Sequence, residues 1–249
     1  MNGIEIEPKE SSISSEHCRD FFNQKWQLYQ KVLGNNYMGH QEMYHYLQQF
    51  LASNFKQPFQ IMDLGCGDSS FMATALLNTS VASYLGIDLS EVALEIASKN
   101  MNGVARQTRF MQGDFKEILP AFLNESADRF DVIASSFAIH HLTLEQKSQI
   151  FERIHRLLLP GGVFLLIDIV SKPAETRETY IQRYLDGVEQ TWLQLTPAET
   201  KIVSEHMLGS DFPETEETLS SLAAQNGFRQ QQCLYENSSE TARLIVFYA

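Results

Sequence analysis

The sequence predicts an α/β protein built on a Rossmann-like, doubly wound sheet, and three observations carry this expectation. From Gln60 onward, short apolar strand patterns alternate with helical stretches at the spacing of right-handed β-α-β units. The strand patterns are apolar on both faces, as a parallel sheet covered by helices on both sides requires. The last two strand patterns are joined only by "NSSE", so they should pair antiparallel.

Ahead of the sheet, residues 16–57 are predicted to form two helices, because apolar side chains recur there at helical spacing. Pro58 ends the second helix. We expect the pair to form an N-terminal lid, and we expect the polar residues 1–15 to be a disordered tail. The two apolar stripes consist of Phe21, Phe22, Trp26, Tyr29, Val32 and Leu33, and of Met43, Tyr44, Leu47, Phe50 and Leu51.

The main domain is expected to span residues 58–249. Ser90 is a good N-cap for one of its helices, and Thr143 with Gln146 forms a capping box for another. After the fifth strand, residues of about 173–212 show helical stretches without a strand pattern, so we expect a helical insert that forms a cap. The strands are predicted at 61–64, 84–88, 108–113, 130–137, 162–170, 228–236 and 241–249, with helices near 69–78, 90–100, 115–123 and 143–158.

Composition and charge narrow the possible functions. The chain has 249 residues, and its 31 acidic and 19 basic side chains leave a net charge of −12. Such a surface repels phosphate backbones, so we expect no DNA partner and disfavour RNA. No apolar run approaches the roughly 20 residues that a membrane span needs. The odd, widely spaced cysteines Cys18, Cys66 and Cys233 indicate a reducing compartment, and the expected location is the cytoplasm.

A glycine-containing loop follows the first strand, at the sheet edge where open α/β folds bind ligands. Gly65 and Gly67 let the backbone approach a ligand closely. A Walker loop is excluded because no Gly-Lys-Ser/Thr follows, and Ser70 stands where a dinucleotide fingerprint needs its third glycine. Asp88, at the end of the second strand, is placed to accept both hydroxyls of a ribose.

Further acids follow the same edge. Asp114 comes directly after the third strand, where it could accept the amino group of an adenine while Phe115 offers its backbone N–H to the ring. Asp114 and Asp68 are also typical helix-start acids. Together with Asp63 and Asp88 they would repel a pyrophosphate, but they suit a cationic nucleoside without a phosphate.

Five motifs in series resemble those of the class I S-adenosylmethionine-dependent methyltransferases. They are "DLGCGDS", "GIDLS", "QGDF", "FDVIASSFAIHHL" and "LLPGGVFLLID", and the resemblance covers residues of about 60–168. The terminal hairpin is also similar, which implies a seven-stranded sheet of order 3-2-1-4-5-7-6 with the last strand antiparallel. Ser69 departs from the family's commoner third glycine.

The resemblance implies a cofactor and its contacts. S-adenosyl-L-methionine would be the methyl donor and S-adenosyl-L-homocysteine the product. Tyr37 and His40, between the two N-terminal helices, are equally compatible with closing over cofactor or substrate and with packing as a hinge. The implied cofactor contacts are Gly65, Gly67 and Ser135 for the methionine portion, Asp63 for its amino group, Asp88 and Leu89 near the ribose, and Asp114 and Phe115 at the adenine.

Methyl transfer from a sulfonium needs a base only when the acceptor atom must lose a proton. His140 and His141 follow the fourth strand and are candidates for that base, although they are also consistent with packing on the cofactor. Asp168, at the end of the fifth strand, could orient an acceptor or simply bond to backbone. Consecutive histidines in a strand-like segment should point apart, so we expect no metal.

The helical insert should complete the substrate pocket. Its aromatic side chains, Tyr184 and Trp192 among them, suit either a small, partly apolar acceptor or the insert's own core. We therefore expect methylation of an oxygen or nitrogen of a small metabolite by a monomer or homodimer. The segment after the fourth strand, "SSFA", lacks the Asn/Asp-Pro-Pro element of enzymes that methylate amino groups of bases. The alternatives are a tRNA wobble-uridine-type modification enzyme, a non-catalytic protein that binds the cofactor, and a nicotinamide-dependent reductase.

Overall fold

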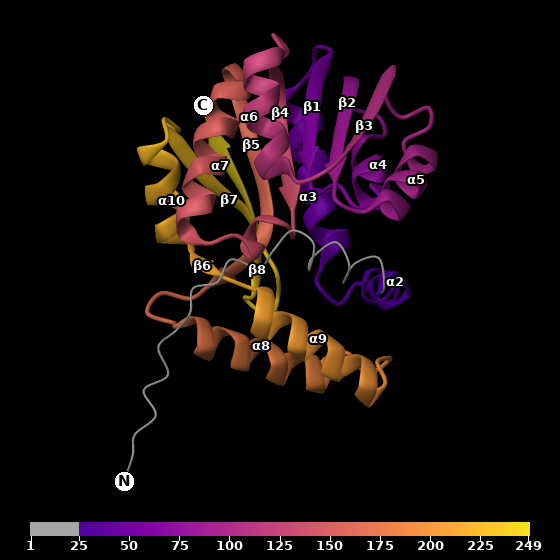
Figure 1. Ribbon diagram of the computed structural model, residues 1–249, viewed down its shortest axis with the longest axis vertical. Coiled ribbons are helices and arrows are strands. Elements are labelled where there is room, and N and C mark those ends of the chain that lie inside the picture. The colour runs from indigo at the N-terminus through magenta and orange to yellow at the C-terminus, as the bar shows by residue number, and fades with distance from the viewer. Residues whose placement is uncertain (1–24) are drawn as a thin grey trace.

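The computed structural model describes residues 25–249, and Figure 1 shows their arrangement. The predicted tail, residues 1–15, and the start of the first predicted helix lie outside the described residues. One central sheet is covered by helices on both faces, and a pair of helices lies below it in this view (Figure 1). The predicted α/β class is confirmed.

The main path of the sheet has the order β3-β2-β1-β4-β5-β8-β7. β8 is antiparallel to both β5 and β7, whereas the other pairs along this path are parallel. This is the predicted order, with one unpredicted short strand, β6, beside the end of β5. The strands are β1 (Phe59–Leu64), β2 (Val81–Asp88), β3 (Gln107–Gln112), β4 (Phe130–Ser136), β5 (Leu158–Ser171), β6 (Glu214–Thr215), β7 (Gln230–Glu236) and β8 (Ala242–Tyr248).

Two apolar cores flank the sheet. Helices α3, α4 and α5 contribute to the core on one face, and α6, α7 and α10 contribute to the core on the other. The predicted caps are present: the Ser90 hydroxyl accepts from the backbone N–H of Ala93, and Thr143 forms a capping box with Gln146. These helices are α3 (His40–Asn54), α4 (Ser70–Leu76), α5 (Glu91–Asn100), α6 (Phe115–Glu125), α7 (Leu144–Leu157) and α10 (Glu216–Gln225).

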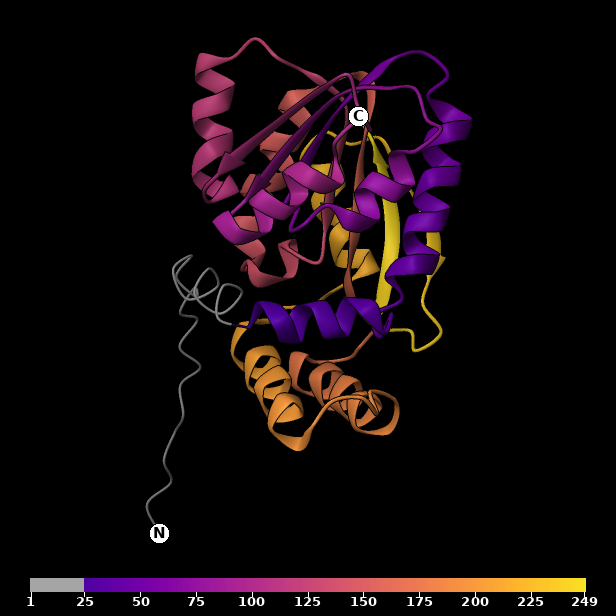
Figure 2. The ribbon, with the colours of Figure 1, turned by 90° about the vertical axis from the view of Figure 1, so that its right-hand side faces the viewer.

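The C-terminal edge of the parallel strands faces a separate layer of helices (Figures 1 and 2). It consists of the cap helices α8 (Arg177–Thr191) and α9 (Pro197–Ser210), with α2 (Trp26–Gly34) between them and the sheet. The expected N-terminal pair is thus divided, since α2 lies in this layer whereas α3 packs on the face of the sheet.

Helix α2 is tied to both of its neighbours. Gln30 Nε2 donates to Asp68 Oδ2 in the glycine loop at 2.9 Å. Lys31 Nζ lies 2.9 Å from Glu199 Oε2 of α9. The cap, α2 and the rim of the sheet therefore enclose the space beyond the strand ends. Among the described residues, no helix combines the length and the apolar character needed to cross a bilayer.

Candidate functional site

Two adjoining pockets occupy the space between the sheet edge and the cap. The rim pocket holds about 870 Å³ of empty space, and its walls include the glycine loop, the end of β2 and the start of α6. The cap pocket holds about 690 Å³ between α2, the cap and the loop after β4. Tyr29, Phe137 and His141 line both, so the two pockets meet at these three side chains.

The glycine loop forms one wall of the rim pocket and depends on its unusual backbone. Gly65 has φ +70°, and a Cβ on it would lie 2.5 Å from Cβ of Ala138. Gly67 is also left-handed, with φ +51°. Ser69, which replaces the third glycine of the motif, adopts φ +53°, and its hydroxyl pairs with Tyr84 at 2.9 Å. The serine thus takes a glycine-like conformation held by a side-chain hydrogen bond.

Asp88 connects the ends of two strands at this rim. Its Oδ2 accepts from the Gly67 N–H at 2.8 Å, and its Oδ1 accepts from the Ser90 N–H at 2.9 Å. Burial raises the pKa of this carboxyl, while the backbone N–H donors oppose the rise. Asp88 lines the rim pocket, and the backbone N–H of Leu89 is a further donor to its carboxylate.

Asp63 lies buried beneath the loop rather than in the pocket wall. Its Oδ2 accepts from the Tyr84 hydroxyl at 2.8 Å, while Oδ1 has no hydrogen-bond partner among residues 25–249. Burial raises the pKa of Asp63 to about 7, and the Tyr84 hydrogen bond opposes the rise. Ser135 is likewise buried, and its hydroxyl donates to the Leu64 carbonyl at 2.9 Å.

The far wall of the rim pocket contains Leu89, Asp114, Phe115 and Lys116. Asp114 is also the N-cap of α6, because its carboxylate accepts from the Lys116 N–H at 2.8 Å. The sequence left open whether Asp114 caps a helix or lines the ligand site, and the structure shows that it does cap α6 and that it also lines the pocket. The Lys116 ammonium lies 3.4 Å from the Asp114 carboxylate.

Three aromatic residues of the pockets were missed by sequence reasoning. Trp26 and Tyr29 belong to the predicted apolar stripe of α2, but they line the rim pocket. Burial, reinforced by Asp68 and Asp88, raises the pKa of the Tyr29 hydroxyl. Phe137 follows β4 with φ +50°, an uncommon backbone angle for a bulky residue, and lines both pockets. An apolar stripe on a helix and a single Phe after a strand predict only core packing, so the sequence alone carries no signal that these three residues line a pocket.

His140 is held rigidly at the polar end of the cap pocket. Its Nδ1 lies 2.5 Å from Asp168 Oδ1, and its backbone N–H donates to Asp168 Oδ2 at 2.9 Å. Asp168 lines neither pocket and also accepts from the Ile169 N–H at 2.9 Å, so it orients the imidazole from behind. Burial lowers the pKa of His140, but Asp168 and Asp211 together outweigh burial and leave it raised.

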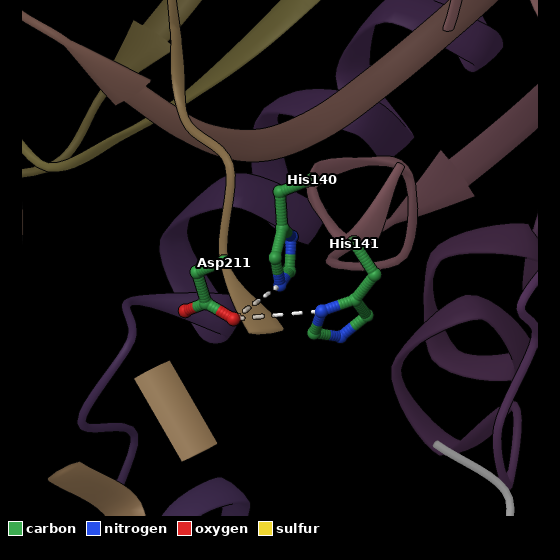
Figure 3. A group of neighbouring side chains, drawn as sticks. All are labelled: His140, His141 and Asp211. Carbon is green, nitrogen blue, oxygen red and sulfur yellow. Dashed lines mark ion pairs between the residues drawn. The ribbon is translucent and has the colours of Figure 1, made fainter. Parts of the chain in front are cut away.

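The expectation that His140 and His141 point apart is wrong. They occupy a single 3₁₀ turn, Ile139–His141, and their ring centroids lie 4.0 Å apart. Both rings face the carboxylate of Asp211, which follows α9 (Figure 3). Asp211 Oδ1 lies 3.6 Å from His140 Nε2 and 3.4 Å from His141 Nδ1. Sequence reasoning missed Asp211 and the nearby His206, because about 70 residues separate them from the histidines and no motif connects them.

Of the remaining predicted site residues, two line the cap pocket and two lie outside both pockets. Tyr184 and Trp192 line the cap pocket. Tyr37 lines neither pocket: its ring stacks on Trp192 with centroids 4.9 Å apart, and its hydroxyl accepts from the Gln194 N–H at 2.8 Å. His40 also lies outside both linings, where burial lowers its pKa to about 4. The other apolar side chains around the cap pocket are Leu28, Val32, Met38, Ile169, Val203 and Met207.

Comparison with known proteins relates this chain to methyltransferases. A family model described as a methyltransferase domain matches residues 61–162. An uncharacterized methyltransferase of Synechocystis sp. is 36% identical over 110 residues, which cover 44% of this chain and 47% of that protein. A demethylmenaquinone methyltransferase of Leptospira interrogans is 27% identical over 173 residues, or 68% of this chain and 66% of that protein. The chain thus spans about half to two thirds of the length of these relatives.

Two solved structures share the fold over nearly the whole chain. Magnesium protoporphyrin IX methyltransferase from Synechocystis, solved with bound S-adenosylhomocysteine, has a TM-score of 0.64 at 17% identity and covers 94% of this chain and 98% of its own. Mitomycin 7-O-methyltransferase also has a TM-score of 0.64, at 16% identity, and covers 95% of this chain and 61% of its own. At such identities the likeness establishes a common fold.

Proposed function

Because this chain belongs to the class I S-adenosylmethionine-dependent methyltransferases, we propose that it transfers a methyl group from that cofactor to a small, largely apolar metabolite. The acceptor atom in this proposal is an oxygen or a nitrogen. One observation carries the proposal: a pocket with the acids and glycines of a nucleoside site opens into a second, mostly apolar pocket. Two small molecules placed in these pockets would meet at Tyr29, Phe137 and His141.

The charges and the glycines of the rim pocket support its assignment to the cofactor. The bare backbone at Gly65 and Gly67 leaves room for the methionine portion. Asp88, with Leu89 beside it, is the proposed acceptor for the ribose hydroxyls, because this carboxylate lines the pocket at the end of β2. Asp114 and Phe115 are proposed to receive the adenine. These acids oppose a pyrophosphate and favour a sulfonium, which supports this cofactor over a dinucleotide.

Asp63 and Ser135 are proposed to act from below the loop. The unpartnered Oδ1 of Asp63 is a ready acceptor for the cofactor's ammonium group, directly or through a water. Ser135 fixes the end of β4 against that of β1 through its bond to Leu64. Both residues would therefore shape the methionine end of the site.

When bound, S-adenosylmethionine supplies an activated methyl group on a sulfonium. The protein's own contribution is to align the acceptor with that methyl and to exclude water, and such positioning lowers a barrier by as much as about 7–11 kcal/mol. Tyr29 and Phe137 form the common wall that would fix this alignment. His140 and His141 are proposed to contact the reacting group of the acceptor, with Asp168 holding His140 in place.

The cap pocket supports an acceptor with an apolar body and one polar group. Its walls are mostly aliphatic and aromatic, Tyr184 and Trp192 included. Its charged and imidazole side chains are Lys25 of the N-terminal segment and the group of His140, His141, His206 and Asp211. Relatives named for methylating demethylmenaquinone and malonyl-[acyl-carrier protein] are consistent with a range of acceptors in this family. We propose a small-molecule substrate, a monomer or homodimer, and the cytoplasm as its location.

Calorimetry with S-adenosylmethionine and with NAD tests the cofactor, because the proposal requires binding of the first and none of the second. Turnover is then tested by incubating the protein and methyl-labelled cofactor with a metabolite extract and following the label by mass spectrometry. Label in a small molecule supports the proposal. Label only in RNA would favour a tRNA-modifying enzyme, and cofactor binding without any transfer would favour a binding protein.

A further inference from the structure

We propose that His140, His141 and Asp211 form a binding site for one divalent transition-metal cation at the polar end of the cap pocket. Their donor atoms all lie within 4.8 Å of one another, and the three side chains converge on one point (Figure 3). The two histidines come from the turn after β4 and the aspartate from the segment after α9, so a cation would join the cap to the sheet.

The spacing of the donor atoms suits coordination better than hydrogen bonding. Asp211 Oδ1 stands 3.6 Å from His140 Nε2 and 3.4 Å from His141 Nδ1, longer than a normal hydrogen bond. Two ligands that are each about 2.0–2.2 Å from one tetrahedral metal are about 3.3–3.6 Å apart. Asp211 Oδ1 is buried and has no hydrogen-bond partner within residues 25–249, and its nearest polar neighbours are these two imidazole nitrogens. A buried carboxylate oxygen in that state marks a place for a cation.

The surroundings of His140 prepare it as a ligand. Its Nδ1 faces Asp168 at 2.5 Å, and as the donor of that bond it leaves the lone pair of Nε2 directed toward Asp211. A carboxylate behind a histidine is the usual support for a metal-binding imidazole, because it fixes the ring and raises its basicity. Asp168 is itself held by the backbone N–H groups of His140 and Ile169.

His141 requires one rearranged proton. Its Nδ1 lies 3.1 Å from the Ser210 carbonyl, which accepts from that nitrogen when it is protonated. A cation on Nδ1 requires the other neutral tautomer, in which the single ring proton has moved from Nδ1 to Nε2. The ring itself needs little movement, since Nδ1 already lies on the side of Asp211 (Figure 3).

Two imidazoles and one carboxylate select the metal. Imidazole suits zinc, iron and cobalt, whereas magnesium and calcium prefer ligands that are all oxygen. Three protein ligands leave further coordination positions open, as in catalytic rather than structural zinc sites. All three residues line the cap pocket, so those positions face the acceptor. A role for the metal in binding an acceptor oxygen rests on the proposed function, whereas the metal site itself does not.

The test uses the full chain, stripped of metal with a chelator, and titrates Zn²⁺ by calorimetry, with Co²⁺ absorption as a second readout. We expect the described site to take one Zn²⁺ per chain and to give visible cobalt bands typical of nitrogen ligation. Asp211→Asn and His141→Ala should each weaken this binding by about tenfold or more. His45→Ala, an exposed histidine of α3, should bind as the wild type does.

Circular dichroism separates loss of the site from loss of the fold. Asp211→Asn and His141→Ala should both lose zinc affinity and both keep the wild-type spectrum. The inference is overturned if zinc does not bind, or if Asp211→Asn and His141→Ala bind it as tightly as His45→Ala. In that event the three residues form only the ion-paired cluster that joins the cap to the turn after β4. This readout needs no methyl transfer, so it is independent of the cofactor and turnover experiments.

Discussion

Asp168 grips His140 at two points, accepting from its backbone N–H at 2.9 Å and facing its imidazole Nδ1 at 2.5 Å. Both residues are buried, so loss of the carboxylate strands donors that water cannot reach. Asp168→Ala should lower the free energy of unfolding by about 1–3 kcal/mol. Urea denaturation measures this effect. Asp168→Asn, which keeps one acceptor, should fall between that variant and the wild type, and equal stability of all three would contradict the role of Asp168.

Gly65 should tolerate no side chain. Gly65→Ala places a Cβ 2.5 Å from that of Ala138 in a left-handed backbone, so the loop must shift and cofactor binding should weaken by about tenfold or more. Gly103→Ala is the matched control, because Gly103 has φ +77° with nothing within 4 Å. Both variants carry the backbone strain, but only the first should lose affinity for S-adenosylhomocysteine in calorimetry. Equal affinities would show that the loop does not touch the cofactor.

Asp88 should matter through its carboxylate. Asp88→Ala removes the proposed ribose acceptor and frees the Gly67 N–H, so cofactor affinity should fall by about 1–3 kcal/mol, or roughly 5-fold to 150-fold. The matched control is Asp131→Ala, since Asp131 accepts from the Gln60 N–H at 2.8 Å at the N-terminal ends of β4 and β1, the edge of the sheet opposite the pocket. Calorimetry should show wild-type affinity for the control, and unchanged affinity of Asp88→Ala would refute the ribose placement.

Asp63 should make the stability of the unliganded protein depend on pH. Its folded pKa of about 7 exceeds the ordinary value of 3.8, so the folded state holds a proton that the unfolded state releases. The resulting stabilisation is complete below pH 3.8 and is lost as the pH rises through 7, at up to about 1.4 kcal/mol per pH unit. Asp63→Asn cannot titrate, so its stability relative to the wild type should grow between pH 5 and pH 8.

The measurement for Asp63 is urea denaturation at several pH values without cofactor. Ser135→Ala, a buried neighbour with no titrating group, should differ from the wild type by the same amount at every pH. If the Asp63→Asn curve runs parallel to the wild-type curve, then the carboxyl of Asp63 does not hold this proton.

Trp192 joins the cap to the N-terminal segment by stacking on Tyr37 and lines the cap pocket. Trp192→Ala should open a cavity and destabilise the fold by about 3 kcal/mol. It should also raise the KM for the acceptor while leaving cofactor affinity near the wild-type value, because Trp192 does not line the rim pocket. Leu193→Ala, at 76% exposure, is the control and should change neither. An equal loss of cofactor affinity would mean that the pockets are not separable.

The fold was predictable because its signals are local. Two-sided apolar strands, the caps at Ser90 and Thr143, and a short final hairpin each follow from neighbouring residues, and together they predict the observed sheet order. The two-residue strand β6 was missed because it is too short to have a pattern. Asp88 and Asp114 line the same pocket because parallel strands end at one edge of the sheet. Their contacts with the ribose and the adenine stay predictions.

The polar end of the cap pocket was not predictable in the same way. Asp211 reaches His140 and His141 only because α8 and α9 fold back over the sheet edge, and tertiary packing of an insert leaves no local pattern. The sequence predicts an extended segment at residues 139–141, in which neighbouring side chains point apart, whereas the observed 3₁₀ turn brings the two imidazoles together. For His40 the sequence allowed either a substrate contact or packing, and the structure shows a buried ring that stacks on Phe71.

Helix α2 holds the glycine loop through Gln30 and the cap through Lys31, residues one position apart. Because Tyr29 of the same helix lines both pockets, a displacement of α2 would alter the rim pocket and the cap pocket together.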